Sequence, residues 1–183
     1  EEEIQLRRVI DSTFVTEHDL TIEFESLTKE LTKSAHAISI TNGTLALFAC
    51  IKALEIGPGD EVIVPNITFA ATANAVILAG ATPVLAEVSD NTFCIDIDSI
   101  LENITTKTKA IIPVHLYGHT VNIKEIQRLA EKYDCIIMED ASQAHGALGE
   151  DNIKAGSFGK AAAFSLYPGK NLGAAGDAGV ITT

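Results

Sequence analysis

Two spacings of apolar residues alternate along the chain, and the alternation predicts its elements. Segments in which apolar residues recur every three or four positions predict helices, and short continuous apolar runs predict strands. The helical pattern covers residues 1–34, about 44–55, 70–79, 97–104 and 123–133. The strand pattern covers residues 37–40, 61–65, 83–88, 110–114, 135–138 and 178–183. This rhythm is typical of an α/β fold, in which helices cover both faces of a mainly parallel central sheet.

The elements suggest a division of the chain into two parts. Residues 1–34 are expected to form an N-terminal helical segment, and residues 35–183 an α/β domain. The last predicted strand stands at the end of the sequence and does not close a domain. The chain is therefore expected to be a fragment whose domain is partial, with the C-terminal half of the fold absent.

Composition narrows the class of protein. With 183 residues and 46% hydrophobic content, the chain can form one substantial core. The formal net charge is −12 and the basic residues are dispersed, which argues against nucleic acid or an anionic membrane as a partner. No apolar run reaches membrane-spanning length. Cys50, Cys94 and Cys135 lack metal-like spacing, so we expect buried thiols in a cytoplasmic protein.

Two residues indicate the chemistry. Lys170 lies on a Pro-Gly turn between an apolar run and a glycine-rich loop, where partial desolvation would make its amine a nucleophile towards aldehydes. Asp140 follows an apolar strand, at the sheet edge where ligands of α/β proteins bind. Pyridoxal 5'-phosphate (PLP) requires a lysine for its aldehyde and an acid for its ring nitrogen. Taken alone, Asp140 could equally be a helix cap or a loop carboxylate.

Weaker signals surround these two residues. Thr44 and Leu45 open a predicted helix, so their backbone N–H groups could bind a phosphate, although an ordinary helix cap is the commoner explanation. Phe69 follows a strand and could stack on a ring, or belong to the core. Gln143 and His145 follow Asp140 closely enough to share a pocket, or could be surface residues.

Other motifs are rejected. His115 and His119 stand four apart, but Gly118 interrupts them and no helix aligns them, so we expect no metal site. The segment around Lys170 lacks the serine or threonine of a nucleotide phosphate loop. The glycines at 173, 176 and 179 do not have the spacing of a dinucleotide-binding fingerprint.

Six stretches, in order along nearly the whole chain, resemble one family, the PLP-dependent sugar aminotransferases of the DegT–StrS type. They are Thr41-Asn-Gly-Thr-Leu-Ala-Leu47, Gly57-Pro-Gly-Asp-Glu-Val-Ile-Val-Pro65, Thr68-Phe-Ala-Ala-Thr-Ala-Asn74, Ala110-Ile-Ile-Pro-Val-His-Leu-Tyr-Gly118, Glu139-Asp-Ala-Ser-Gln-Ala-His-Gly146 and Phe164-Ser-Leu-Tyr-Pro-Gly-Lys-Asn-Leu-Gly173. The resemblance implies the large domain of a fold-type I PLP transferase. It also implies a homodimer of longer chains with its active site at the interface.

The resemblance also implies a role for each matching residue. Lys170 would form a Schiff base with the cofactor and move protons, and Asp140 would pair with the pyridine nitrogen. Gln143 would approach the ring hydroxyl, and Phe69 would stack on the ring.

The phosphate would be held by three groups. These are the Thr44 and Leu45 backbones and the Ser165 hydroxyl. His145 would belong to the substrate pocket. The family usually has Ser-Gly-Thr where this chain has Asn42-Gly-Thr44, which changes one hydroxyl.

The implied function is transfer of an amino group, from glutamate as the amino-acid donor, to a nucleotide-linked keto-sugar. Three alternatives stay open. A PLP-dependent sugar dehydratase would carry histidine in place of Lys170. A non-catalytic, PLP-binding regulatory protein would have no need to retain both Lys170 and Asp140. A dinucleotide-binding oxidoreductase is disfavoured by the glycine spacing.

Overall fold

The structure is a computed structural model that describes residues 2–16 and 18–183. The α-helices are α1 (Glu2–Ser12), α2 (Asp19–Thr32), α3 (Gly43–Ala53), α4 (Ala71–Leu78), α5 (Ile97–Asn103) and α6 (Ile123–Tyr133). The strands are β1 (Ala37–Ile40), β2 (Glu61–Pro65), β3 (Thr82–Ala86), β4 (Thr108–Ile111), β5 (Ile136–Asp140), β6 (Ala161–Ser165) and β7 (Gly179–Thr182). Short 3-10 turns cover Leu116–Gly118 and Glu150–Asn152.

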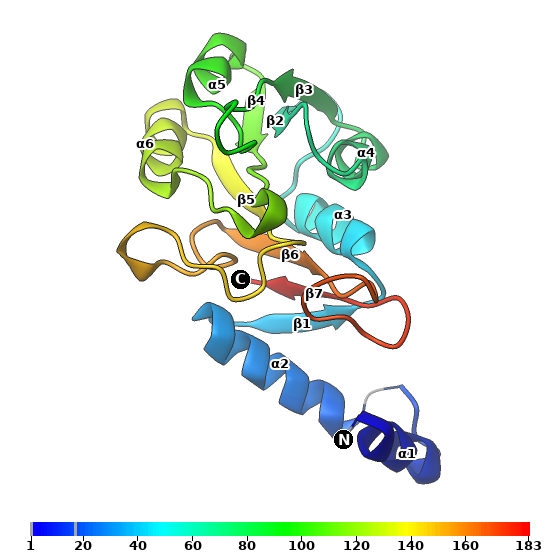
Figure 1. The fold of residues 1–183 in the computed structure, drawn as a ribbon. Coiled ribbons are helices and arrows are strands. Elements are labelled where there is room, and N and C mark those ends of the chain that lie inside the picture. The colour runs from blue at the N-terminus through cyan, green and yellow to red at the C-terminus, as the bar shows by residue number, and fades with distance from the viewer. Residues whose placement is uncertain (1, 17) are drawn as a thin grey trace.

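Within the described residues, the strands form a single seven-stranded sheet in the order β1-β7-β6-β5-β4-β2-β3 (Figure 1). From β6 to β3, neighbouring strands are parallel. Strand β7 runs antiparallel to both β1 and β6. The predicted α/β fold with a mainly parallel sheet is therefore confirmed.

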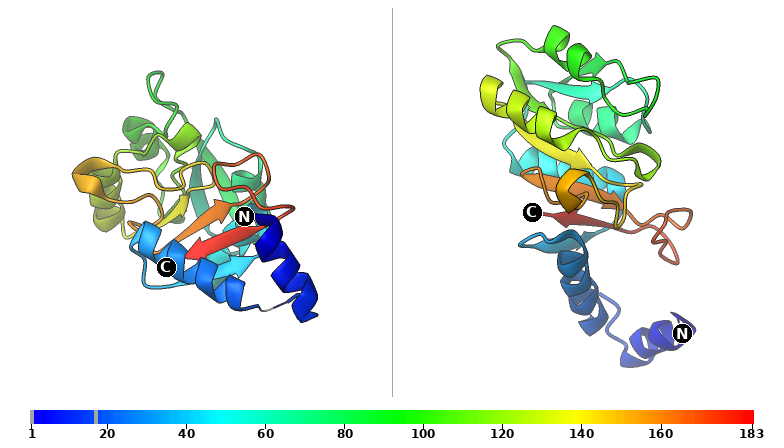
Figure 2. Two further views of the ribbon diagram at one scale, coloured as in Figure 1. Left: turned by 60° about the horizontal axis from the view of Figure 1, so that its bottom comes forward. Right: turned by 60° about the vertical axis from the view of Figure 1, so that its left-hand side comes forward.

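Helices cover both faces of the sheet, because its central strands are apolar on both sides. Val62 and Val64 of β2 pack in one core cluster with α3 and α4. Ile63, between them, packs in the opposite cluster with α5 and α6. Figure 2 shows the two helical layers from other directions. Successive side chains of a strand point to opposite faces of the sheet, so a continuous apolar run buries side chains on both faces.

Helix α6 illustrates how the sequence sets an element. Its buried residues, Ile123, Ile126, Leu129 and Ala130, recur every three or four positions and form one face. Asn122 begins the helix by accepting a hydrogen bond from the N–H of Glu125. The observed helix, Ile123–Tyr133, has the predicted bounds.

The N-terminal segment forms two helices. Helix α2 packs beside the edge strand β1, and a carboxylate oxygen of Glu25 accepts the Ser39 N–H at 2.7 Å. Helix α1 lies beyond α2, away from the sheet (Figures 1 and 2), and none of its described residues is buried. Glu1 and Glu17 lie outside the described residues. The division into a helical segment and a domain stays a prediction. No helix among the described residues is long and apolar enough to cross a membrane.

Two strand boundaries differ from the predictions in a way that bears on the site. The strand expected over 110–114 ends at Ile111, and Pro113, which has no N–H to donate, lies beyond it. The strand expected over 135–138 continues to Asp140, because the Asp140 N–H bonds to the Pro113 carbonyl at 2.9 Å. Asp140 is therefore the last residue of β5. Its carbonyl also accepts a hydrogen bond, from the His115 N–H at 3.1 Å, so its backbone is held on both sides.

Candidate active site

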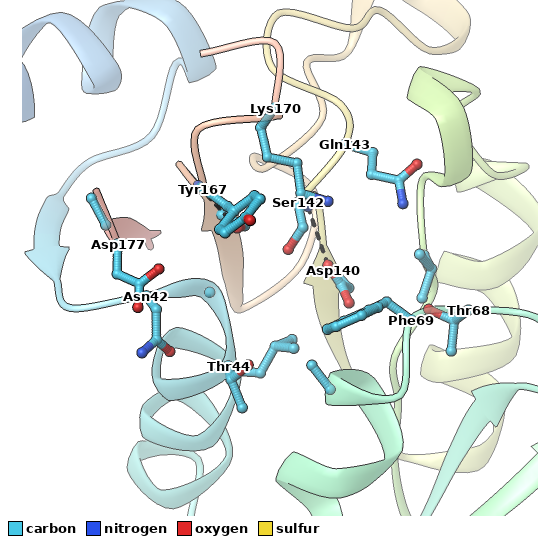
Figure 3. A pocket seen from close by; sticks show the side chains of 16 residues that line it. Asn42, Thr44, Thr68, Phe69, Asp140, Ser142, Gln143, Tyr167, Lys170 and Asp177 are labelled. Carbon is cyan, nitrogen blue, oxygen red and sulfur yellow. Dashed lines mark hydrogen bonds between the residues drawn. The ribbon is translucent and has the colours of Figure 1, made fainter. Parts of the chain in front are cut away.

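A cavity of about 580 Å³ lies at the carboxyl ends of the parallel strands (Figure 3). Its wall is formed by residues from the segments 42–47, 68–71, 114, 140–143, 165–170 and 177–178. These segments follow β1, β2, β4, β5 and β6, and precede β7. Because β7 is antiparallel to its neighbours, its first residues meet the last residues of the others at one edge. This is the edge at which open α/β sheets bind ligands.

Asp140 lies at the inner end of the cavity and is only 4% exposed. Its Oδ2 accepts the Thr72 hydroxyl at 2.8 Å, and its Oδ1 accepts the Ser142 N–H at 3.1 Å. Hydrogen bonds from neutral donors to a carboxylate stabilise the charged form. The carboxyl group is therefore fixed at both oxygens, and it still lines the cavity.

Lys170 enters the cavity from the loop that follows β6. Its N–H bonds to the Tyr167 carbonyl at 2.8 Å, which closes the Pro-Gly turn predicted from the sequence. In Figure 3 the side chain extends from this turn into the cavity on the side of Asp140. Of the described residues that line the cavity, Lys170 is the one basic side chain. The predicted lysine and aspartate therefore share a single cavity.

The N-terminus of α3 forms another part of the wall. Gly43 and Thr44 line the cavity, and their N–H groups stand in the first turn, where a helix supplies no internal acceptors. The positive end of the helix dipole adds to the attraction for an anion. The Asn42 Oδ1 caps the helix by accepting the Leu45 N–H at 2.9 Å. The Leu45 N–H is thus engaged by Asn42 in this structure, and its expected role in binding a phosphate stays a prediction.

Two glycines allow neighbouring backbone segments to approach the N-terminus of α3 closely. A Cβ on Gly43 would stand 2.7 Å from the Ser165 Cβ, and a Cβ on Gly179 would stand 2.7 Å from the Asn42 carbonyl carbon. Ser165 therefore lies against the first turn of α3. Its Oγ accepts the Tyr167 N–H at 3.4 Å, which leaves the hydroxyl proton able to point at an anion in the cavity.

Phe69 and Gln143 lie on the wall as predicted. Phe69 is 72% exposed and is not part of the core formed by the described residues. The Gln143 Oε1 accepts the Tyr117 N–H at 2.9 Å. Because a backbone N–H can only donate, this bond fixes the amide orientation and leaves the Gln143 NH₂ as a donor for the cavity.

His145 does not line the cavity, contrary to expectation. The turn closed between Ala141 and Ala144 separates it from Gln143, and its ring packs on Phe164 at a centroid distance of 5.3 Å. Both ring nitrogens are buried and lack a hydrogen-bond partner among the described residues. Burial lowers the pKa of His145. The Ser165 backbone, near the ring but outside good hydrogen-bond geometry, opposes the shift, and the charge of Lys170 adds to it.

The other predicted loop histidine, His115, is fully buried and is hydrogen-bonded to Glu139. Its Nδ1 accepts the Val121 N–H at 3.3 Å, so its proton is on Nε2, which faces Glu139 Oε2 at 3.0 Å. Glu139 also accepts three backbone N–H groups, from Gly156 at 2.6 Å, Phe158 at 2.9 Å and Gly159 at 2.9 Å. The described residues contain no group of three side chains that could hold a metal ion.

Sequence reasoning missed Glu139, Thr72 and Ser142. Glu139 stands beside Asp140 in β5, but its side chain faces the other side of the sheet. Thr72 is fully buried, yet its partner Asp140 is 68 positions away in the sequence. A threonine in the first turn of a predicted helix was the available signal, and it indicates capping as readily as an active-site contact.

Comparisons with known proteins agree with this geometry. The chain is 50% identical over 149 residues to UDP-N-acetyl-3-dehydro-alpha-D-glucosamine 3-aminotransferase of Acidithiobacillus ferrooxidans. The aligned segment covers 81% of this chain and 40% of the relative. An aminotransferase structure from Psychrobacter cryohalolentis matches with a TM-score of 0.95 and 38% identity, over 100% of this chain and 46% of that one.

A Bacillus subtilis structure with bound cofactor PMP matches with a TM-score of 0.88 and 34% identity, over 100% of this chain and 42% of that one. The chain thus spans less than half the length of each of these three proteins. The family model of the DegT/DnrJ/EryC1/StrS aminotransferases matches residues 1–183. The chain belongs to the DegT/DnrJ/EryC1/StrS aminotransferase family.

Proposed function

We propose that the whole protein is a PLP-dependent aminotransferase that moves an amino group, from glutamate, to a nucleotide-linked keto-sugar. One observation carries the proposal. Lys170, Asp140 and the first turn of α3 come from distant parts of the sequence and line a single cavity.

The residues of the cavity fit PLP by their chemistry. At one place, the Gly43 and Thr44 N–H groups and the Ser165 hydroxyl offer donors to a phosphate. The missing Cβ of Gly43 is what allows Ser165 to lie so close to the first turn of α3. At another, Asp140 offers a carboxylate to a protonated ring nitrogen. The Gln143 NH₂ is a donor suited to the ring hydroxyl.

Each of these groups would have a distinct task. The α3 first turn and Ser165 would bind the phosphate, and the exposed ring of Phe69 would cover one face of the cofactor. When bound, PLP would supply an electrophilic aldehyde and a ring that accepts electrons. Asp140 would keep the ring nitrogen protonated, and Gln143 would hold the ring hydroxyl in place.

Lys170 would supply the amine that the aldehyde of PLP requires, and would afterwards carry protons. Its turn is held by the Tyr167 carbonyl, which fixes the point from which the side chain enters the cavity. Asp140 is almost fully buried, so it would limit the access of water to a ring nitrogen bound beside it. Such exclusion strengthens a charged hydrogen bond.

The finer parts of the proposal draw on the relatives. A nucleotide-linked sugar is the substrate class named by the Acidithiobacillus ferrooxidans relative. A bound PMP, the amine form of PLP, is named for the Bacillus subtilis structure. The glutamate donor, the homodimer and the cytoplasmic location are our proposals from the sequence and its family resemblance.

The alternatives fit the cavity less well. A dehydratase of this type would place a histidine where Lys170 stands. A regulatory protein that binds PLP without catalysis would have no use for a lysine and a carboxylate in the same cavity. Product analysis is therefore the discriminating measurement.

The proposal is tested by trapping the cofactor. Borohydride reduction of the PLP-loaded whole protein should leave the label on Lys170, with Lys154 and Lys160 as internal controls in neighbouring peptides. Label on either control would overturn the assignment. Incubation with glutamate and a panel of nucleotide-linked keto-sugars should yield an amino-sugar, and a dehydrated product without nitrogen would instead support the dehydratase.

A further inference from the structure

Two threonines connect the cavity wall to the buried side of Asp140. The Thr72 Oγ1 lies 2.8 Å from Asp140 Oδ2, and the Thr68 Oγ1 lies 2.9 Å from the Thr72 Oγ1. Thr72 is fully buried in the first turn of α4, whereas Thr68 precedes the helix and lines the cavity. The hydroxyls and the carboxylate therefore form a continuous chain.

Proton counting gives this chain a direction. An ionised carboxylate can only accept, so the single proton of Thr72 points at Asp140. The competing acceptor, the Phe69 carbonyl, is neutral and lies farther away, at 3.2 Å. With its proton committed, the Thr72 oxygen can only accept from Thr68. Each donor polarises the next, which strengthens the final bond to Asp140.

We propose that Thr72 is a positioning residue for Asp140, and that Thr68 orients the Thr72 hydroxyl. The inference rests on the proposed function. The Thr72 donor would keep Asp140 ionised beside a protonated ring nitrogen, so that the proton stays on the cofactor. Ser142, which donates its N–H to Oδ1, would hold the second oxygen. Without the Thr72 hydroxyl, Asp140 would keep its place in β5 and lose its strongest neutral donor.

The charged groups near Asp140 do not replace this donor. Lys170 and Asp177 lie on the cavity wall, and neither has a hydrogen bond to Asp140 in the part of the chain that the structure describes. Glu139 and His115 pair with each other in their own buried cluster. Thr72 is therefore the side chain whose removal should act on Asp140 most directly.

The decisive measurement is the ¹⁵N chemical shift of the ring nitrogen in labelled PLP bound to the whole protein. Thr72→Val keeps the shape and removes the hydroxyl, and should move the shift towards the unprotonated value set by Asp140→Asn. Thr72→Ser restores the hydroxyl and should return the shift to the wild-type value. We expect kcat to fall about tenfold to a hundredfold in Thr72→Val, with a much smaller change in PLP affinity.

Thr182→Val is the matched control. Thr182 is also fully buried, and its hydroxyl bonds to the Gly156 carbonyl at 2.7 Å. It lies in β7, which pairs with β1 and β6 and not with the Asp140 strand β5. This variant should cost stability and leave the nitrogen shift unchanged. An equal shift in Thr182→Val would show a general effect of lost packing and would overturn the inference.

A second variant covers the case in which Thr72→Val does not fold. Thr68→Val removes the donor to Thr72 and should shift the nitrogen signal in the same direction by a smaller amount. An unchanged ¹⁵N shift in folded Thr68→Val would overturn the inference. If PLP is still attached at Lys170 in the wild-type protein, the proposed function would stand. Failure of the wild-type protein to attach PLP at Lys170 would instead overturn the proposed function.

Discussion

Glu139→Gln should destabilise the fold far more than its small change in shape suggests. The fully buried Glu139 carboxylate accepts four donors, three from the backbone and one from His115. Glutamine has nearly the same size, but one end of its side chain becomes an NH₂ group, which cannot accept. The question is whether any orientation of the amide satisfies the four donors.

Neither orientation does. With the NH₂ at the Oε1 position, the N–H groups of Phe158 and Gly159 both lose their acceptor. With the NH₂ at the Oε2 position, the Gly156 N–H loses its acceptor, and the NH₂ also meets the Nε2–H donor of His115. The His115 ring could accept from the NH₂ only by moving its proton to Nδ1, where the Val121 N–H already points.

Two donors are therefore left without an acceptor in either orientation, partly buried in the first and fully buried in the second. An unsatisfied buried donor costs about 1–3 kcal/mol. With two such donors, we expect a loss of about 2–4 kcal/mol in the free energy of unfolding. That is a large share of the roughly 5–15 kcal/mol that stabilises a typical protein.

Urea unfolding of the whole protein measures the effect. The control is Glu25→Gln, the same substitution at a half-exposed residue that accepts a single N–H, from Ser39, and keeps an oxygen for it. The control should change the free energy of unfolding by less than about 1 kcal/mol. A Glu139→Gln variant as stable as the control would refute the donor count and the ionised state of Glu139 on which it depends.

Three further predictions concern the cavity. Asp140→Asn should lower kcat by roughly 10²-fold or more with a smaller loss of PLP affinity, and near-normal kcat would contradict the pyridinium role. Thr44 and Ser165 both line the cavity, and we propose that the Thr44 hydroxyl adds to the backbone donors of α3. Thr44→Ala and Ser165→Ala each remove one hydroxyl and should each weaken PLP binding by about 1–3 kcal/mol, with a non-additive double variant, and unchanged affinity in both would contradict this phosphate site. His145 should titrate below its ordinary value of 6.5 because burial lowers its pKa. Its contribution to stability should be complete above pH 6.5 and decline as the pH falls from there towards the folded pKa, and an NMR midpoint at or above 6.5 would contradict this.

Much of the fold could be predicted because its elements carry local signals. The strand 61–65 and the helix 123–133 have the predicted bounds, since Asp60 and Asn122 punctuate long periodic runs. The place of β7 could not be predicted in this way. Nothing within residues 178–183 indicates that the strand runs antiparallel between β1 and β6, because pairing partners are set by the whole sheet.

The residues of the candidate site likewise differ in whether a local sequence signal identifies them. Asp140 was predicted from its place after an apolar strand and Lys170 from its Pro-Gly turn, and both signals are local. Ser165 was expected only from the family resemblance. The surroundings of Leu45 and His145 could not be predicted, because they depend on one side-chain hydrogen bond and on one turn.

The β1–β7 ladder has a consequence for how the chain is made. Ile40 pairs with Gly179, so the partner of β1 is synthesised about 140 residues later. At a ribosomal rate of about 5–20 residues per second, β1 waits roughly 7–30 s for β7. During that time one edge of β1 is open to other nascent chains. The strand has four residues, and on its other edge Glu25 is already in place for the Ser39 N–H. A short, partly bonded strand offers a poor template for intermolecular pairing while translation continues.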